Sequence, residues 1–448
     1  MPSVTPLADA RLGRRLRLLS GALQGLVPVA LAALAGGCPR AGSQPTVPPW
    51  PMFGHDAAHT GLSDRAGPQA PKLLWSHEIS GVAPGAPAVG ADGTVYVGSG
   101  SLIGTTLYFG PGGQEAGPRG IASAMGGEGA GVTALGPGGT AKWEHPTKGP
   151  VLCSPALGPD GTIYVCGMDG QVSALTAEGG LRWECRLSGS PDSAPTVGPD
   201  GVIYVAPADG SVYAIAPDGT VRWRCEGGAQ LGSSPALDPS GTVYVGSTRF
   251  REGAAWEPRT PEGRLLAVTA QGTVRWRCDA GQATLSAPVV GPDGTVYVAA
   301  GPQLPLLATQ SFVLAVAPDG TPRWRCKLEE EVAGGPALGP DGTVYIAESS
   351  GPVDADGKAK TDGQVCALGT DGTVRWRCAV GTLGSGSLLV DSAGVVYVAA
   401  GAGTVCAVAP DGTLKGRFEV GVSPRYLALG ADGTLYGAGD GIVCALRD

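Results

Sequence analysis

Cysteine is the residue type in this sequence with the greatest capacity for covalent chemistry. The chain has 11 cysteines among 448 residues, and two of them can form a disulfide only where the backbone brings their side chains together. Between Cys153 and Cys166, Gly158-Pro-Asp-Gly161 predicts a tight turn. If this turn joins antiparallel strands with Leu157 opposite Thr162, the same register sets Cys153 opposite Cys166. We therefore predict a disulfide between these two residues, with two free buried thiols as the alternative.

Acid–base and metal chemistry have few candidates. Only four histidines occur, and two of them, His55 and His59, precede the first repeat, where a structural role explains both. Most Asp residues stand before Gly in turn sequences, where the carboxylate caps its own backbone. The sequence therefore predicts no catalytic residue and no metal site.

The N-terminus has the pattern of an export signal, because arginines between positions 11 and 17 precede an apolar run from Leu18 to Leu34. Ala35-Gly36-Gly37-Cys38 resembles a bacterial lipobox, which implies cleavage before Cys38 and lipidation of that residue. Pro39 follows in place of an Asp of the kind associated with inner-membrane retention. We expect a lipid anchor at the periplasmic side of the outer membrane. An ordinary signal peptide or a short membrane anchor is the alternative.

The strands that position these side chains are predicted from a sequence repeat. A Gly followed three residues later by a Tyr that ends a β-branched run returns eight times, most fully as DGTVYV. In most copies a second phrase follows, with Gly four residues before Trp, as in DGTVRW at 218–223. Several short strands within a period of about 40 residues indicate a propeller blade, because one small sheet cannot bury both faces alone. We predict an all-β, eight-bladed propeller of four-stranded antiparallel blades.

The two ends of the repeat region indicate how the ring closes. The last blade stops at Asp448 without a fourth strand, while residues 72–79 carry an outer-strand Trp, Trp75, with no preceding three strands. Pairing the two would hide two exposed strand edges. Gly416 takes the Trp position in the seventh blade, with Phe418 as a possible substitute. The predicted organisation is a signal peptide at 1–37, a tether and leader at 38–70 and the propeller at 71–448.

These repeats resemble the pyrroloquinoline-quinone-type propeller repeat, and Trp50-Pro-Met-Phe-Gly-His-Asp resembles the leader often found ahead of such propellers. The family includes quinone-dependent dehydrogenases and cofactor-free scaffolds, among them a lipoprotein of the outer-membrane β-barrel assembly machinery. The dehydrogenase branch implies adjacent cysteines, a calcium site with carboxylate and amide ligands, and sometimes a CxxCH segment. This chain has no adjacent cysteines, no CxxCH and no Asn. We therefore expect no cofactor, and no bound pyrroloquinoline quinone in particular.

Long insertions indicate where a partner would bind. Four blades carry them between the second and third strands, at 100–130, 248–263, 301–311 and 349–363. Equivalent connections emerge on one face of a propeller, so these loops should crowd one mouth of the ring. Aromatic and Arg side chains in them are candidate partner contacts; covering of loop backbone is the alternative. The candidates are Phe109, Arg119, Arg249, Phe250, Arg251, Trp256 and Arg259.

The charge balance favours a protein partner. The formal net charge is −8, and phosphate backbones require a concentrated basic surface, so we expect no nucleic-acid partner. The sequence favours a non-catalytic exported lipoprotein that binds proteins in the bacterial envelope, with outer-membrane protein assembly as the role that the resemblance implies. The alternatives are a quinone-dependent oxidoreductase and a sensor of small molecules or glycans.

Overall fold

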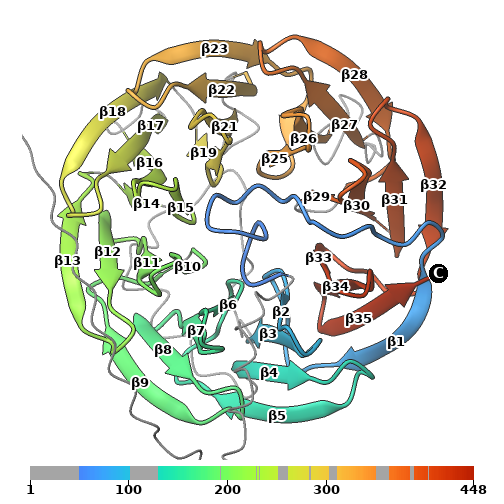
Figure 1. Ribbon diagram of the computed structural model, residues 1–448, viewed down its shortest axis with the longest axis horizontal. Helices are drawn as coiled ribbons and strands as arrows, with labels where there is room; N and C mark the ends of the chain where they lie inside the picture. Colours follow the sequence, from blue (N-terminus) through green and yellow to red (C-terminus); the bar gives the residue numbers. More distant parts are fainter. Residues whose placement is uncertain are drawn as a thin grey trace, which may run out of the picture. The chain divides into compact units, whose positions relative to one another are not determined.

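In the computed structural model, residues 45–448 form one compact unit. The structure describes residues 50–100, 130–191, 193–228, 230–231, 233–250, 261–281, 284–301, 310–349, 363–383, 388–401 and 403–448. The strands of these residues form eight antiparallel sheets, set as blades around a common axis (Figure 1). This confirms the predicted eight-bladed propeller. Within the described ranges, no helix has the length and apolar character needed to cross a bilayer.

Each blade runs outward from a short inner strand. Blades 1 to 3 contain β2(Ala88–Val89), β3(Val95–Ser99), β4(Gly131–Leu135), β5(Ala141–Pro146); β6(Ala156–Leu157), β7(Ile163–Cys166), β8(Gln171–Leu175), β9(Leu181–Arg186); and β10(Thr196–Val197), β11(Ile203–Val205), β12(Ser211–Ile215), β13(Val221–Glu226). Blade 7 contains β29(Leu389–Val390), β30(Val396–Ala400), β31(Thr404–Val408) and β32(Leu414–Glu419). Blade 8 contains β33(Tyr426–Leu429), β34(Leu435–Gly439), β35(Ile442–Arg447) and β1(Lys72–Glu78).

Blades 4 to 6 each have a fifth strand, which the sequence did not predict. They contain β14(Gln230–Leu231), β15(Ala236–Leu237), β16(Val243–Phe250), β17(Pro261–Val268), β18(Val274–Gly281); β19(Thr284–Leu285), β20(Val289–Val290), β21(Val296–Gly301), β22(Phe312–Val316), β23(Pro322–Lys327); and β24(Glu331–Val332), β25(Ala337–Leu338), β26(Val344–Ser349), β27(Gly363–Leu368), β28(Val374–Ala379). The extra strands β14, β19 and β24 pair with the far ends of β16, β21 and β26. A pair of two residues has no periodicity that a sequence pattern could reveal.

The ring has two unlike ends. The turn face carries the turns between first and second strands and between third and fourth strands, and the loop face carries the connections between second and third strands. On the turn face each repeated Asp holds a tight turn: Thr94 donates its N–H and hydroxyl to Asp92, at 3.0 and 2.6 Å. Gly93 follows with φ +77°, a conformation that costs a residue with a Cβ. The DG pairs therefore fix where each hairpin reverses.

Tryptophans on the outer strands lock each blade to the next. Trp324, for example, donates its indole N–H to the carbonyl of Thr370 in the following blade at 2.8 Å. Its ring covers Gly372, which has φ +82° and no room for a Cβ. Six further tryptophans repeat this arrangement, namely Trp75, Trp143, Trp183, Trp223, Trp276 and Trp376. The second DG phrase thus supplies both halves of a contact between neighbouring blades.

The ring closes through the strand that lies earliest in the chain. β1 pairs antiparallel with β35, with Trp75 opposite Ala445, as predicted. In blade 8 the third strand, β35, pairs with β1 as the fourth strand, so no turn joins these two strands. The seventh blade has Gly416 where a Trp would need that turn, and the Phe418 ring covers Gly416 instead. Six blade-to-blade contacts inside the chain and one across the joint therefore use Trp, and the contact between blades 7 and 8 does not.

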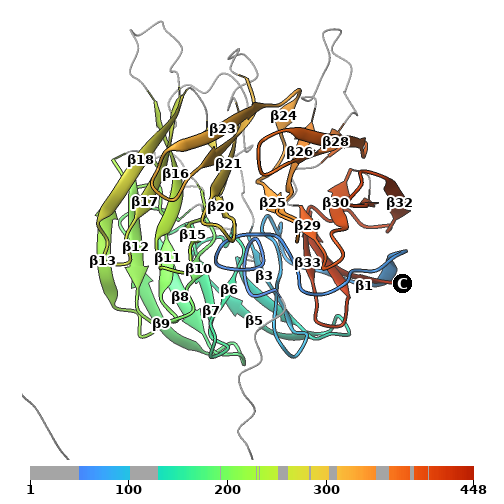
Figure 2. The ribbon, with the colours of Figure 1, turned by 45° about the horizontal axis from the view of Figure 1, so that its top comes forward.

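The described part of the leader, residues 50–70, lies across the centre of the turn face (blue in Figure 1; Figure 2). Innermost strands have an open edge, and the backbone of the leader bonds to them in chain order around the ring, while the His59 side chain reaches back to blade 3. Trp50 pairs with Val89 of blade 1, and His59 bonds to Thr196 of blade 3 at 3.0 Å. Leader carbonyls accept backbone N–H groups from five more blades, at Leu157, Leu237, Val290, Leu338 and Val390. One segment thus satisfies inner edges from seven blades.

Candidate interaction surface

The loop face is raised over three consecutive blades. In blade 4 the second and third strands pair through Phe250 and Pro261, several residues beyond the inner strand β15. β21 and β26 extend in the same direction and are held by β19 and β24. All four predicted insertions join second strands to third strands, and so leave the ring at this face as expected. We call the extended strand ends of blades 4 to 6 the raised wall; in blades 1 and 7 a single bridge, Val82–Gly100 or Leu383–Ala400, stands in place of the extra strand.

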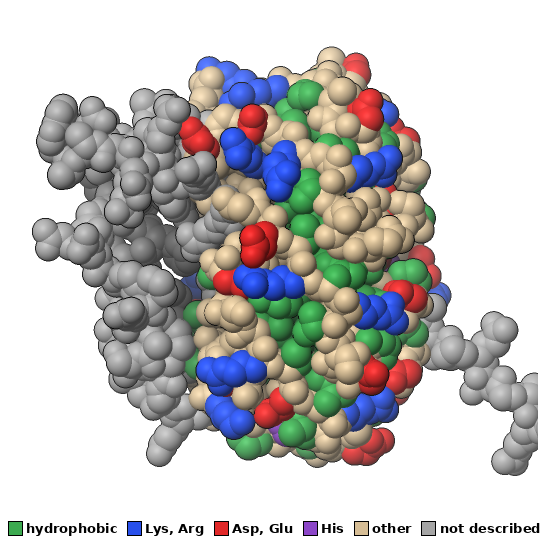
Figure 3. All heavy atoms as spheres, turned by 90° about the vertical axis from the view of Figure 1, so that its left-hand side faces the viewer, with side chains coloured by type: hydrophobic (Ala, Val, Ile, Leu, Met, Phe, Trp, Pro, Cys, Tyr) green, Lys and Arg blue, Asp and Glu red, His purple; other side chains and the backbone are tan. Residues whose placement is uncertain are grey.

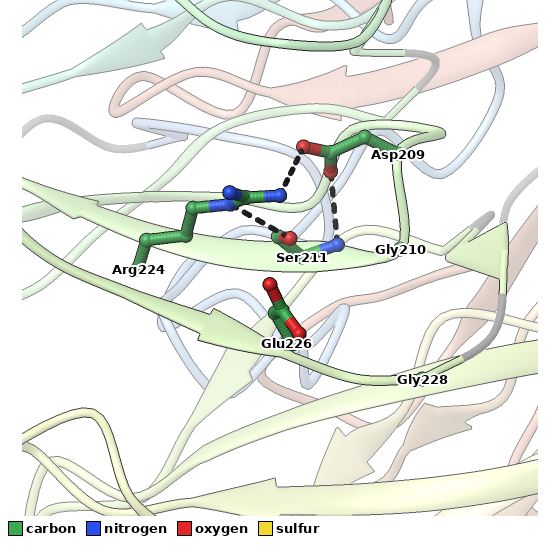
Figure 4. Close-up of a pocket in the computed structure, with 6 residues that line it drawn as sticks. All are labelled: Asp209, Gly210, Ser211, Arg224, Glu226 and Gly228. Atoms are coloured by element: carbon green, nitrogen blue, oxygen red, sulfur yellow. Dashed lines mark hydrogen bonds and ion pairs between the residues drawn. The ribbon is translucent and has the colours of Figure 1, made fainter.

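A polar pocket of about 410 Å³ opens on the loop-face side of blade 3. Asp209 lies in the connection from β11 to β12, two residues before Ser211, and accepts the N–H of Ser211 at 2.9 Å. Arg224, on β13, bonds to Asp209 and Ser211 at 3.3 and 3.0 Å, while the Glu226 carboxylate stands apart from this network (Figure 4). Such a pocket offers hydrogen bonds and negative charge to a polar or basic group. It has no nucleophile paired with a base.

A buried carboxylate lies at the base of the raised wall. Glu348, on β26, is fully buried, yet one of its oxygens accepts the backbone N–H groups of Glu329 and Glu330, both at 3.1 Å. Arg377 of β28 approaches the other oxygen at 4.0 Å and Glu329 at 3.3 Å. These contacts join the residues just before β24 to the second strand of blade 6, β26. A single charged residue inside the apolar run VYIAES was the signal that sequence reasoning missed.

The innermost strands offer no charged partner to the quinone that gives the repeat its name. Pyrroloquinoline quinone carries several carboxylates, which need cationic partners in a protein interior. The eight innermost strands described above contain no Lys, Arg, Asp or Glu. A hydroxyl on these strands bonds to the backbone: Thr196 donates to the carbonyl of Pro235 at 2.5 Å. In the part of the chain that the structure covers, no three His, Cys, Asp or Glu side chains are grouped to hold a metal.

Two of the seven predicted contact residues lie in a described strand. Arg249 and Phe250 end β16, where they pair with Glu262 and Pro261. Five others, and the predicted lipidation residue, lie outside the described residues: Phe109, Arg119, Arg251, Trp256, Arg259 and Cys38. The loop-face position is therefore established for the strand ends that carry the insertions, and the contacts themselves stay a prediction.

The predicted register around Cys153 and Cys166 is wrong by one residue. Leu157 pairs with Ile163, because the turn has three residues, with Gly161 at φ +79°. The side chains are neighbours all the same: the Cys153 thiol donates to the carbonyl of Cys166 at 3.6 Å. Contact with Cys153, together with burial, raises the pKa of Cys166. Both are free thiols in the structure, and the disulfide stays a prediction.

Arginines on the outer strands are engaged at the turn face. Arg375 bonds to Asp341 of its own blade at 2.7 Å, and Arg182 and Arg323 repeat this pair with Asp160 and Asp293. Partial burial alone would raise the pKa of Asp341, but hydrogen bonds from Thr343 and Arg375 hold it at about 2. On the side wall in Figure 3, basic and acidic side chains are interspersed. This wall shows no concentrated basic surface of the kind that nucleic acids require.

The fold and this surface together define the chain as an eight-bladed propeller with a leader across one face and an elevated wall on the other. The PQQ_2 family model, described as outer membrane protein assembly factor BamB, matches residues 128–260, 208–309 and 309–443. The chain therefore belongs to this family, which confirms the resemblance seen in the repeats. No curated protein matches its sequence.

Solved structures share the propeller fold at low sequence identity. The quinohemoprotein alcohol dehydrogenase of Comamonas testosteroni is 16% identical, with a TM-score of 0.61 over 89% of this chain and 80% of that one. BamB of Moraxella catarrhalis is 15% identical, with a TM-score of 0.57 over 84% of this chain and all of that one. The Dos1 propeller is 11% identical, with a TM-score of 0.59 over 84% and 95%. Because an enzyme and an assembly factor are both similar to the chain, these likenesses concern the fold alone.

Proposed function

We propose that this protein is a non-catalytic, protein-binding scaffold of the bacterial cell envelope. It acts in the assembly of outer-membrane proteins and is anchored by lipid on Cys38 at the periplasmic side of the outer membrane. The family match supports the assembly role. The observation that carries the proposal is the unlike use of the two faces: the leader covers the inner strands at the turn face, while blades 4 to 6 extend strands and insertions from the other.

The loop face suits a protein partner for a physical reason. Paired strands fix the points at which the insertions leave the ring, and binding residues are often carried by loops on such a rigid scaffold. Arg and aromatic residues in those insertions are the types that dominate interface energies. The innermost strands, in contrast, lack the charged groups that the quinone of the dehydrogenase branch would need.

Affinity capture from the native membrane tests this proposal. We expect the acylated protein to recover components of the β-barrel assembly machinery, and Cys38→Ser to leave the membrane fraction. A loop-face variant with Arg249→Ala, Phe250→Ala and Trp256→Ala should recover several-fold less. A turn-face variant with Arg182→Ala and Arg323→Ala is the matched control and should behave as wild type. A reproducible set of partners that lacks assembly components would remove the proposed role.

Two other functions give different results. A quinone-dependent oxidoreductase would acquire a bound chromophore and reduce a dye with alcohols once pyrroloquinoline quinone and calcium are added. A sensor is favoured by the polar pocket of blade 3, and its ligand would raise the melting temperature of the isolated propeller.

A further inference from the structure

Cysteines recur at one position between the blades. Five outer strands carry Trp-x-Cys, with the Cys on the side that faces the next blade. In the next blade, the residue that faces this Cys lies on the third strand. Within its own blade, that residue pairs with the outer-strand residue that follows the Trp position, which is Arg in these blades. That residue is Tyr213, Leu266 or Leu314 in blades 3 to 5, and Cys366 or Cys406 in blades 6 and 7. Thiols therefore meet thiols only at the last two of these interfaces.

The interface between blades 5 and 6 has the fuller chemistry. Cys326 of β23 packs on the cluster that contains Cys366 of β27. Cys326 is half-buried, so a small molecule can reach it, whereas Cys366 is fully buried. Cys366 pairs with Ile346, and Glu348 lies two residues further along β26 on the same side of the blade. Burial, and then the negative charge of Glu348, raises the pKa of the Cys366 thiol to about 12. One accessible thiol, one enclosed thiol and a carboxylate thus share a site.

We propose that Cys326 and Cys366 form a redox-active dithiol across the interface between blades 5 and 6, with Glu348 as the base that receives the proton of the enclosed thiol. The oxidant is a small disulfide, which enters from the exposed side of Cys326. This site lies at the base of the raised wall, between blades 5 and 6, and the inference does not rest on the proposed function.

The reaction proceeds by two exchanges. The Cys326 thiolate attacks one sulfur of the small disulfide, forming a mixed disulfide and releasing one thiol. The Cys366 sulfur then attacks Sγ of Cys326 and passes its proton to Glu348, and the second small thiol leaves as a thiolate. Two protein thiols are oxidised and one disulfide is reduced to two thiols. Hydrogen bonds from Glu329 and Glu330 hold the carboxylate in place throughout.

The chain contains matched controls for this chemistry. Cys185 is half-buried at the same strand position as Cys326, but Tyr213 faces it. Cys378 and Cys406 form the equivalent pair one blade further on. There the Cys406 thiol donates a hydrogen bond to the carbonyl of Val380 at 3.5 Å, and a backbone carbonyl cannot act as a base. Cys378 is also less accessible than Cys326, at 7% exposed.

Peptide mapping of the full chain tests the proposal. The native protein is incubated with oxidised glutathione at mildly alkaline pH, quenched and digested without reduction. We expect a Cys326–Cys366 disulfide to form first, Cys185 to stop at the mixed disulfide with glutathione, and Cys378–Cys406 to link at least several-fold more slowly. Failure of Cys326 and Cys366 to link while Cys185 reacts would overturn the dithiol. Equal linking rates for the two pairs would overturn the role of Glu348.

Two variants separate the roles of the residues. Cys366→Ser should leave Cys326 as the mixed disulfide, like Cys185. Glu348→Gln still accepts the two backbone N–H groups, and with it we expect the mixed disulfide to accumulate and closure to slow by roughly tenfold or more. If Glu348 only suppressed ionisation of Cys366 by its charge, the same substitution would speed closure instead. Should a variant fail to fold, the wild-type comparison with Cys185 still decides the proposal.

Discussion

At the scale of single residues, His59 shows how a buried side chain ties the leader to the ring. Its imidazole is 2% exposed and bonds to Thr196 through Nε2 at 3.0 Å. Burial lowers the pKa of His59 to about 4, although Asp56 and the carbonyl of Pro288 oppose this. The imidazole of His59 is therefore neutral in the folded protein at neutral pH. Its protonation would place an unfavourable charge in the buried contact between the leader and blade 3.

This shift predicts loss of stability in mild acid. Because the folded pKa of about 4 lies below the ordinary value of 6.5, the unfolded chain takes up the proton first as pH falls. The contribution is complete above pH 6.5 and is lost toward pH 4, at about 1.4 kcal/mol per pH unit, or roughly 3 kcal/mol in total. Unfolding free energies measured across this range should fall more steeply for wild type than for His59→Gln. Parallel curves would contradict the assignment.

The sequence indicated a structural role for His59 but not what it contacts. Its partner Thr196 lies 137 positions away in the chain, and no local spacing links them. The same holds for Glu348, whose contacts come from Glu329, just before β24, and from Arg377 of β28. Local patterns located the turns and the outer-strand tryptophans because a hairpin is closed by its neighbours in sequence. The contacts that enclose a side chain between blades require the ring.

At the scale of elements, the register of each hairpin depends on turn length. The predicted pairing of Leu157 with Thr162 assumed a four-residue turn, and the three-residue turn ending at Gly161 shifted it by one. Strand identity survived this error because the β-branched runs alone specify it. A glycine with positive φ therefore carries information about register as well as about the turn.

Two glycines with similar backbone conformation should differ in what they tolerate. Gly372 has φ +82° and lies under the Trp324 ring, with 2.6 Å between a Cβ there and the indole, whereas Gly161 has φ +79° and open space around it. Gly161→Ala should cost about 1 to 2 kcal/mol from backbone strain. Gly372→Ala should cost a further 1 to 3 kcal/mol because the indole must move. Thermal unfolding of the two variants measures the difference. Equal losses of stability in the two variants would show that the Trp324 indole can move aside at little cost.

At the scale of the whole molecule, one strand decides whether the ring is shut. β1 covers the open edge of β35, and Trp75 bonds to the carbonyl of Pro137 in blade 1 at 2.8 Å. The leader adds contacts to inner strands from seven blades. The sequence predicted this closure from one surplus Trp and one missing strand, because each blade must complete four strands.

Removing β1 should open the ring. If residues 72–78 are replaced by a flexible linker of equal length, the exposed edge of β35 should recruit other copies, and size-exclusion chromatography should show oligomers. A synthetic peptide spanning residues 70–80 should bind in trans and restore the monomer. The same peptide with Trp75→Ala should do so less well. A variant that stays monomeric without peptide would contradict the assigned closure.

The joint between first and last strands also has a consequence for biosynthesis. β1 leaves the ribosome long before β35 exists, so it must wait unpaired while every other blade is made. Blades 1 to 7 contain all their own strands and can form as they emerge. Throughout that interval the backbone groups of residues 72–78 have no strand to pair with, so the ring can close only after β35 has been made.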